Sequence, residues 1–234
     1  MNYEAVIFDL GNTLVAYYTR DEWPAVLAEC VDGVAACLRE RNLLTVEPND
    51  LPPRVVAERQ TPDDCHVVPL EERLARVFDL GGARLEAGVL PEMCRLFMQP
   101  IFARARRYDD ALPALAELRR RGLKTGILSN SPWGSPAILW REELDRHRLL
   151  TAVDAAAFCR DCGYRKPAPQ AFEHITGKLG VAAGRCLFVG DDPRWDIAGP
   201  HAAGMHAVLI DRTGSAQGAG EAVIRDLAEL LREL

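Results

Sequence analysis

The sequence predicts an α/β protein: a doubly wound, Rossmann-like parallel sheet forms the core, and an all-helical cap domain is inserted into it. Two observations lead to this fold class. After about residue 105, short apolar runs alternate with amphipathic runs of helical period. Between about residues 16 and 102, only helical runs are found. With 234 residues, 48% of them hydrophobic, the chain is long enough to bury a full core and carry a sizeable insertion.

The first predicted strand, residues 5–8, is a short apolar run that ends in Asp9 and a tight Gly-Asn-Thr turn. In α/β proteins, a buried strand that ends in a carboxylate and a turn presents a nucleophile or a metal ligand at the carboxyl edge of the sheet. Asp9 is therefore the first candidate site residue. Two positions later stands Gly11, whose missing side chain can neither donate nor accept a proton.

The predicted insertion follows this strand. Its helical runs cover residues 22–41, 70–79 and 90–105, joined by a proline-rich loop at 48–53 and a second loop at 61–66. A module inserted at the carboxyl end of a strand lies over the active edge of the sheet as a lid. We therefore expect a core domain of residues 1–15 and 103–234 and a cap domain of residues 16–102.

Strands and helices alternate through the rest of the chain. A helix over 111–121 begins after Asp110 and ends at Gly122, and a strand over 123–128 leads into a polar turn at 129–132. The further predicted elements are helices at 136–148, 169–179 and 196–203, strands at 152–158, 185–189 and 206–210, a Gly/Ser-rich linker at 214–220 and a closing helix at 221–234. Such alternation indicates a parallel sheet with helices on both faces.

Polar side chains also follow the other strands of the predicted sheet. The clusters are Ser129-Asn130, Arg165-Lys166-Pro167, and Gly190-Asp191-Asp192 with Asp196. Because the loops after neighbouring strands of a doubly wound sheet converge on one crevice, we expect these clusters to lie beside Asp9. Carboxylates gathered so closely repel one another unless a cation shares the site, and hard oxygen ligands select Mg²⁺. Mg²⁺ and a lysine together suit a phosphoryl group, whose negative charge must be offset before an aspartate can approach it.

In their order and spacing, these residues resemble the four motifs of the haloacid dehalogenase-like (HAD) hydrolase superfamily. The matching stretches are Phe8 to Leu14, Ile127 to Asn130, Arg165 to Pro167, and Val189 to Asp196 followed by Gly199 and Ala203 to Met205. The ordered set spans nearly the whole chain and is specific. The helical insertion after the first motif resembles the family's helical cap. The resemblance implies a Mg²⁺-dependent phosphatase in which Asp9 attacks phosphorus to form an aspartyl-phosphate, which water then hydrolyses.

The resemblance also implies a metal site. Asp9 is expected to be both nucleophile and metal ligand, and Gly11 is expected to offer its backbone carbonyl, a role that needs no side chain. Asp191 is the expected third protein ligand. Asp196 is expected to support the metal, with Asp192 a weaker candidate for the same place.

For the phosphoryl group, the resemblance implies contacts from Ser129, from the backbone N–H of Asn130 and from Lys166. Lys166 is also expected to hold Asp9 ionised. Arginine outnumbers lysine 25 to 3 in this chain, so a lysine beside a proline at this place suggests that a compact charge is needed where a planar guanidinium would not fit. The expected catalytic residues are thus Asp9, Ser129 and Lys166.

The departure from the family pattern is Gly11, where the family's phosphatases usually carry a second aspartate that protonates the leaving group. Such general acid–base help is worth roughly 10²- to 10⁴-fold, or about 3 to 5 kcal/mol of barrier. Three explanations for the missing acid stay open: the leaving group departs without a proton donor, a cap side chain such as Asp21, Tyr17 or His66 supplies the proton, or the enzyme is slow.

The residues also bear on three other functions, two of them within the same superfamily. A haloacid dehalogenase has no need of the acidic fourth motif, so Asp191, Asp192 and Asp196 disfavour that reading. A phosphonoacetaldehyde-type hydrolase needs a cap lysine for a Schiff base, and residues 16–102 contain none. A catalytically weak Mg²⁺- or phosphate-binding regulatory protein stays open as an alternative.

The composition limits the kinds of molecule with which the protein can be expected to interact. A net charge of −6 and a pI near 5.5 argue against nucleic-acid binding, and we find neither a signal peptide nor a membrane span. Seven cysteines without framework spacing fit reduced thiols in the cytoplasm, where we expect the protein as a monomer or homodimer acting on a small phosphorylated substrate. The identity of that substrate stays open. Side chains that either line its pocket or form cap core are Tyr17, Tyr18, Arg20, Trp23, Trp133, Trp140 and Arg141.

Overall fold

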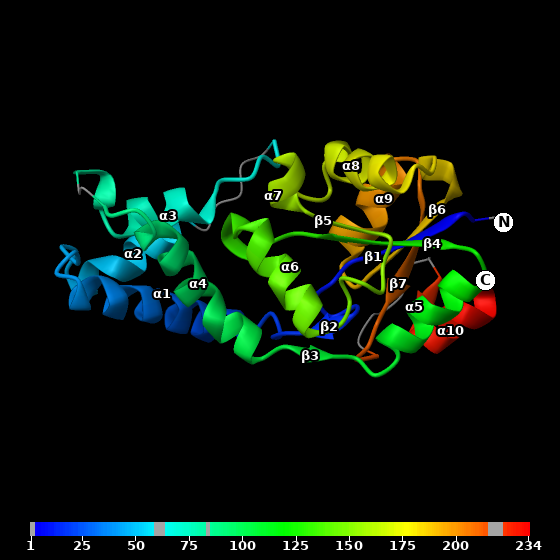
Figure 1. The fold of residues 1–234 in the computed structure, drawn as a ribbon, viewed down its shortest axis with the longest axis horizontal. Coiled ribbons are helices and arrows are strands. Elements are labelled where there is room, and N and C mark those ends of the chain that lie inside the picture. The colour runs from blue at the N-terminus through cyan, green and yellow to red at the C-terminus, as the bar shows by residue number, and fades with distance from the viewer. Residues whose placement is uncertain (1–2, 59–63, 83–84, 215–221) are drawn as a thin grey trace.

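The computed structural model describes residues 3–58, 64–82, 85–214 and 222–234. Its core is a six-stranded sheet with the order β5-β4-β1-β6-β7-β8 (Figure 1), and every pair of neighbouring strands in it is parallel. The strands are β1 (Ala5–Phe8), β4 (Lys124–Ser129), β5 (Ala155–Phe158), β6 (Cys186–Gly190), β7 (His206–Ile210) and β8 (Val223–Ile224). The chain runs outward from β1 in both directions, so the sheet is doubly wound and its crevice lies beside β1.

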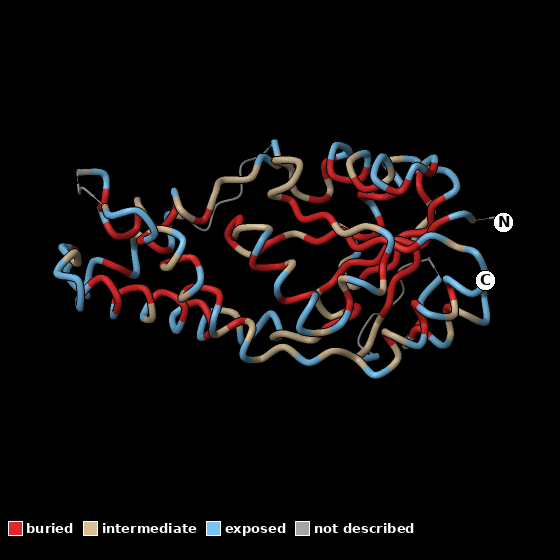
Figure 2. The backbone as a smooth tube through the Cα atoms, viewed as in Figure 1, coloured by how far each residue is buried: buried red, intermediate tan, exposed pale blue. Residues whose placement is uncertain are grey.

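Helices cover both faces of this sheet, as the alternation of strands and helices predicts. Val6 and Phe8 of β1 face one hydrophobic cluster, which includes side chains of α5 (Ala111–Arg120) and α10 (Leu227–Glu233). Ala5 and Ile7 face the other cluster, to which α8 (Pro169–Leu179) contributes. Because successive strand residues point to opposite faces, the fully apolar run of β1 fits a strand buried on both sides. Figure 2 shows this central strand region as mostly buried.

The cap lies at the other end of the molecule from the sheet (Figure 1), and its regular elements in the described residues between β2 and β3 are helices. Its helices are α1 (Trp23–Glu40), α2 (Leu51–Ala57), α3 (Leu70–Val77) and α4 (Val89–Ala103), with short 3₁₀ turns at Pro48–Asp50 and Leu80–Gly82. The long helices α1 and α4 pack against each other through the apolar stripe that their helical period predicts. No helix of the described chain has the length and apolar character that a membrane crossing requires.

A two-stranded antiparallel ribbon joins the cap to the core. It pairs β2 (Val15–Ala16) with β3 (Arg106–Arg107), directly before and after the cap helices. The sequence did not predict this ribbon, because strands of two residues leave no readable periodicity. Our division into a core of residues 1–15 and 103–234 and a cap of residues 16–102 stays a prediction, and the ribbon lies across that boundary.

Three sequence predictions of local structure are wrong. The proline-rich stretch 48–53 is not only a loop, because α2 begins at Leu51 and its prolines occupy the first turn, where a missing N–H breaks no helical hydrogen bond. The helix predicted over 196–203 begins earlier, as a π-helix over Pro193–Ala198 that continues into α9 (Gly199–Ala202).

The closing helix is also shorter than predicted. β8 comes first, and α10 then begins after Asp226, whose carboxylate accepts a hydrogen bond from the Glu229 N–H at 2.8 Å. Most of the predicted linker at 214–220 lies outside the described residues.

Candidate active site

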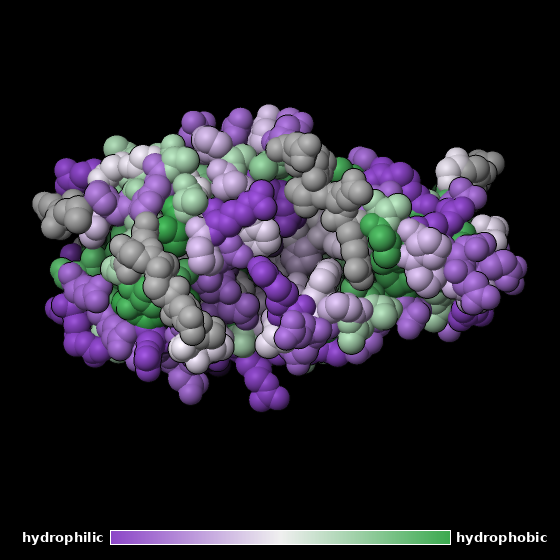
Figure 3. All heavy atoms as spheres, turned by 180° about the vertical axis from the view of Figure 1, so that it is seen from behind, coloured by the Kyte–Doolittle hydropathy of each residue, from purple (hydrophilic) through white to green (hydrophobic). Residues whose placement is uncertain are grey.

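The expected site residues lie around one cavity of about 510 Å³ at the carboxyl edge of the sheet. The cavity is lined by all of them, namely Asp9, Gly11, Ser129, Asn130, Lys166, Asp191 and Asp196. They meet there because β1 pairs with both β4 and β6, so that the residues following these strands emerge side by side. On the face drawn in Figure 3, the surface is hollowed between the cap and the core.

A buried ion-pair triad forms the centre of the site. The Lys166 ammonium lies 2.6 Å from a carboxylate oxygen of Asp9 and 2.6 Å from one of Asp196. The exposed fractions of these residues are 3% for Lys166, 7% for Asp9 and 1% for Asp196. Burial by itself lowers the pKa of Lys166, but the charges of Asp196 and Asp9 more than offset burial and raise it. Lys166 is therefore a permanent positive charge beside the Asp9 carboxylate.

Two local features hold this triad in place. The side-chain amide of Asn130 donates to the Lys166 carbonyl at 3.1 Å and accepts from the Lys166 backbone N–H at 2.9 Å. Gly190, the last residue of β6, leaves space for Asp196, because a Cβ at position 190 would lie 2.4 Å from the Asp196 carboxyl carbon. The positioning role of the Asn130 side chain was missed from the sequence, which suggested only a backbone contact.

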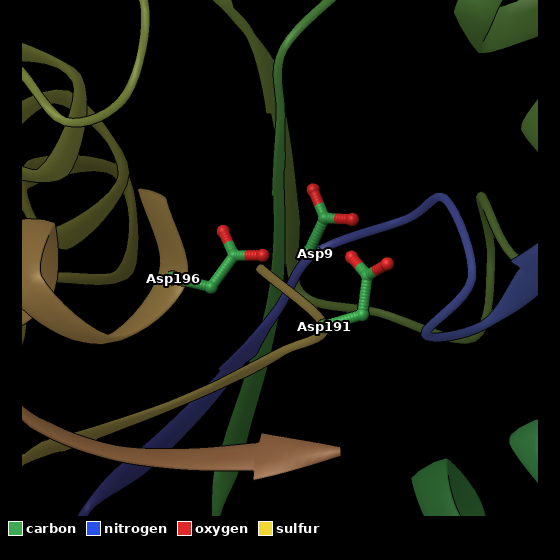
Figure 4. A group of neighbouring side chains, drawn as sticks. All are labelled: Asp9, Asp191 and Asp196. Atoms are coloured by element: carbon green, nitrogen blue, oxygen red, sulfur yellow. The ribbon is translucent and has the colours of Figure 1, made fainter. Parts of the chain in front are cut away.

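Three carboxylates form an acidic cluster next to Lys166. Asp9, Asp191 and Asp196 each offer one oxygen, and these oxygens all lie within 4.8 Å of one another (Figure 4). Burial and the charges of Asp9 and Asp196 raise the pKa of Asp191 to about 7, although the Asn12 amide donates to it at 3.2 Å and opposes the rise. Such mutual repulsion favours a bound cation, and a set of oxygen donors fits a hard divalent ion.

Asp192 takes a different place. One of its oxygens accepts hydrogen bonds from the backbone N–H groups of Arg194 at 2.9 Å and Trp195 at 3.2 Å, which caps the π-helix. Its other oxygen lies 3.6 Å from the Arg20 guanidinium. Of the two acids that the sequence offered as metal support, Asp196 therefore joins the acidic cluster and Asp192 serves as a helix cap.

Comparison with known proteins identifies the family. Residues 3–204 match a protein-family model described as haloacid dehalogenase-like hydrolase. The chain belongs to this family. Among characterised relatives of this HAD-like hydrolase, the phosphatase MT3486 of Mycobacterium tuberculosis is 38% identical over 73% of this chain and 74% of its own length. A phosphoserine phosphatase of Thermus thermophilus is 36% identical over 62% of this chain and 55% of its own length.

Solved structures agree with the fold class predicted from the sequence. A HAD phosphatase of Thermococcus onnurineus superposes with a TM-score of 0.67 at 25% identity, covering 98% of this chain and 97% of its own. A 2-haloacid dehalogenase of Pseudomonas syringae superposes with a TM-score of 0.70 at 22% identity over the same shares, a likeness that concerns the fold alone. The prediction of a HAD-like hydrolase with a Rossmann-like core and helical insertion is confirmed.

At Gly11, the HAD-like hydrolase has open space. A Cβ built on Gly11 would have its nearest neighbours at 3.9 Å, on the Tyr17 ring, and at 4.0 Å, on an Asp9 oxygen. Tyr17 also lines the cavity, and its buried hydroxyl has no hydrogen-bond partner within the described structure. Burial, together with the charges of Glu143 and Asp9, raises the pKa of Tyr17, so its hydroxyl stays protonated.

The other two cap residues offered as proton donors lie elsewhere. Asp21 is exposed and is not among the residues that line the cavity. His66 is exposed as well, lies 2.8 Å from an Asp64 oxygen and packs on Tyr164 with ring centroids 4.3 Å apart. Of the three, only Tyr17 borders the site in the described part of the chain.

Aromatic and cationic side chains complete the wall of the cavity. Its aromatic members are Tyr17, Tyr18, Trp23, Trp133, Trp140 and Trp195, and its arginines are Arg20, Arg73 and Arg165. The sequence left most of these aromatics open between pocket and core, and it did not single out Arg73 or Trp195. It placed Arg165 in a cluster expected beside Asp9 but gave the Arg165 side chain no role of its own. Position 165 had a readable signal, since it lies within the third motif. Arg141, in contrast, pairs with Asp161 at 2.7 Å and does not line the cavity.

Proposed function

We propose that this protein is a Mg²⁺-dependent phosphatase that hydrolyses a small phosphorylated metabolite through an aspartyl-phosphate on Asp9. The observation that carries the proposal is the buried Asp9–Lys166 pair at 2.6 Å, beside an acidic cluster that fits a divalent cation. Phosphatases among the relatives, from Mycobacterium tuberculosis and Thermus thermophilus, support the same reaction class.

In the proposed reaction, a carboxylate oxygen of Asp9 attacks the phosphorus of the ester, the bond from phosphorus to the alcohol oxygen breaks, and that oxygen takes up a proton from solvent or from Tyr17, which borders the site. Water then attacks the phosphorus of the aspartyl-phosphate and releases inorganic phosphate and the free Asp9 carboxylate. Lys166 offsets the charge of the phosphoryl group throughout, and Ser129 and the Asn130 N–H hydrogen-bond its oxygens.

The cation would be held by Asp9, the Gly11 carbonyl and Asp191, with Asp196 in support. When bound, Mg²⁺ supplies positive charge that offsets the charge of the phosphoryl oxygens. The three carboxylates with oxygens within 4.8 Å of one another are the observation that supports this assignment.

The test is phosphate release from p-nitrophenyl phosphate and a panel of sugar phosphates and nucleotides. We expect turnover that requires Mg²⁺ and that Asp9→Asn removes. Asp21→Asn is the matched control, because Asp21 is an exposed carboxylate outside the cavity, and it should retain full turnover.

Two other results would replace the proposal. Halide release from 2-chloropropionate, without phosphate release, would favour the dehalogenase whose fold this chain shares. Absence of any turnover, with Mg²⁺ binding retained, would favour a weak Mg²⁺- or phosphate-binding regulatory protein.

A further inference from the structure

The tryptophans of this protein are concentrated at one place. The chain contains four tryptophans, and all four line the cavity. Trp133 and Trp140 are only 8% and 4% exposed and pack on the rings of Phe97 and Phe158, so little of their surface is open to a ligand. Trp23 and Trp195 are only half-buried. Indole rings that remain partly open in a cavity offer flat apolar faces for a ligand.

Tyr18 supports Trp23 from one side. It stacks on Trp23 with ring centroids 5.0 Å apart and an angle of 25° between the ring planes. Both residues come from the chain that enters the cap, whereas Trp195 lies in the π-helix of the core that follows β6. The open aromatic faces are therefore contributed by both cap and core, which is the arrangement that a bound ring between them would need.

The arginines of the cavity differ in their partners. Arg20 lies 3.6 Å from an Asp192 oxygen, and Arg73 lies 3.6 Å from a Glu58 oxygen. Arg165 donates to the Ser131 carbonyl at 3.0 Å but faces no carboxylate within ion-pair distance in the described chain. A guanidinium has five N–H donors, so Arg165 retains both charge and donors for a ligand.

A hydrogen bond to the cap fixes the backbone of Arg165 at the wall of the cavity. Its backbone N–H donates to the carbonyl of Cys65, in the cap, at 2.9 Å. Its charge reaches the aromatic wall, because burial raises the pKa of Tyr18 and Arg165 opposes that rise. It directly precedes Lys166, the charge at the reacting centre. An anion on Arg165 would therefore lie in the same cavity as both the phosphoryl site and the open rings.

We infer, on the basis of the proposed phosphatase function, that the substrate is a phosphate monoester whose alcohol carries a flat ring and a second anionic group. The ring stacks on the face of Trp23 that Tyr18 does not cover and contacts Trp195, and the second anion binds Arg165. A cavity of about 510 Å³ lies within the range of roughly 300 to 1,000 Å³ that holds ligands larger than a two- or three-carbon phosphate.

Three synthetic esters test this inference: cyclohexylmethyl phosphate, benzyl phosphate and 4-carboxybenzyl phosphate. All three release a primary alcohol, so the departure of the leaving group contributes little to differences in kcat/KM, and the variants below separate that contribution from recognition. The flat ring should raise kcat/KM of benzyl over cyclohexylmethyl phosphate by roughly 2- to 10-fold. The carboxylate should add about 10- to 100-fold through the charged hydrogen bonds to Arg165.

Variants assign these gains to residues. Arg165→Gln should remove the preference for 4-carboxybenzyl over benzyl phosphate, and Arg165→Lys should restore part of it. Trp23→Leu should remove the preference for benzyl over cyclohexylmethyl phosphate. Arg141→Gln is the matched control outside the cavity, and it should change neither ratio.

The outcomes separate this inference from the proposed function. Equal kcat/KM for the three esters, with Asp9-dependent turnover, would overturn the inference and leave the phosphatase proposal standing. An equal loss for all three esters in Arg165→Gln would also overturn it, because the residue would then act on the reaction and not on the second anion. Absence of phosphate release from any ester, p-nitrophenyl phosphate included, would overturn both.

Discussion

Gly190 offers a test of the site that depends on one missing atom. A methyl group at this position would lie 2.4 Å from the carboxyl carbon and 2.5 Å from a carboxylate oxygen of Asp196. Contacts this short force a shift, and Asp196 is held at both oxygens, by Lys166 at 2.6 Å and by the Asp192 N–H at 3.1 Å. Gly190→Ala must therefore displace Asp196 from Lys166 or bend the end of β6.

The structure sets the size of the effect. Overpacking of this kind costs about 1 to 3 kcal/mol, and loss of one partner of a buried ion pair costs about 3 to 5 kcal/mol. Since Asp196 can shift in part, we expect the lower range, which corresponds to a fall in Tm of roughly 2 to 12 °C for a chain of this size. Phosphate release should fall as well, because Lys166 loses one of the two carboxylates that position its ammonium.

Thermal unfolding followed by circular dichroism, with phosphate release measured on the same samples, checks this prediction. Gly177→Ala is the control, because Gly177 lies inside α8 and a Cβ there meets nothing within 4 Å. Alanine in a helix interior should stabilise the protein by about 0.5 to 1 kcal/mol, the opposite sign. A Gly190→Ala protein with unchanged Tm and unchanged activity would refute the placement of Asp196.

Three further variants test other parts of the site. Gly11→Asp should fold normally, because no atom lies closer than 3.9 Å to the added Cβ. It should speed hydrolysis of alkyl phosphates by roughly 10²-fold or more, but not that of p-nitrophenyl phosphate. If the variant and the unaltered protein hydrolyse alkyl phosphates at equal rates, another group already protonates the leaving group. Asn130→Ala should lose about 1 to 3 kcal/mol in urea unfolding, from two hydrogen bonds to Lys166. Asn130→Asp should lose at least as much, because it keeps the acceptor but replaces the donating amide with an oxygen that faces the Lys166 carbonyl. Lys166→Met should lose about 3 to 5 kcal/mol at pH 7 in the presence of a chelator, since Asp9 and Asp196 are then buried without their cation, and a loss below about 1 kcal/mol would contradict the triad.

The positions of the strand-end residues were predictable because the sheet topology places these residues side by side. Asp9, Ser129 and Asp191 each follow or end a strand, and parallel pairing of those strands leaves little freedom in where these residues emerge. Lys166 was predictable for a different reason, as part of a motif before a helix. The family assignment rests on the same four stretches and is confirmed by the family match.

The cavity wall was less predictable, because it depends on how the cap packs on the core. Arg73 enters the wall from α3, which is far along the chain from every core motif, through contacts that no local pattern encodes. The short elements were missed for a related reason: β8 and the β2–β3 ribbon are two-residue strands defined by their partners rather than by their own sequence. The two hydrogen bonds between the Asn130 side chain and the Lys166 backbone were missed for the same reason, because they form only when the third motif is folded against the second.

The central claim, that Asp9 is the phosphoryl-accepting nucleophile, can be measured directly. An acyl phosphate is reduced by borohydride to the alcohol, so an aspartyl-phosphate trapped by rapid quenching becomes homoserine, which mass spectrometry locates in the digested protein. We predict homoserine at position 9 only when substrate and Mg²⁺ are both present. Phosphate release without any reduction at position 9, or with reduction at another aspartate, would contradict the account.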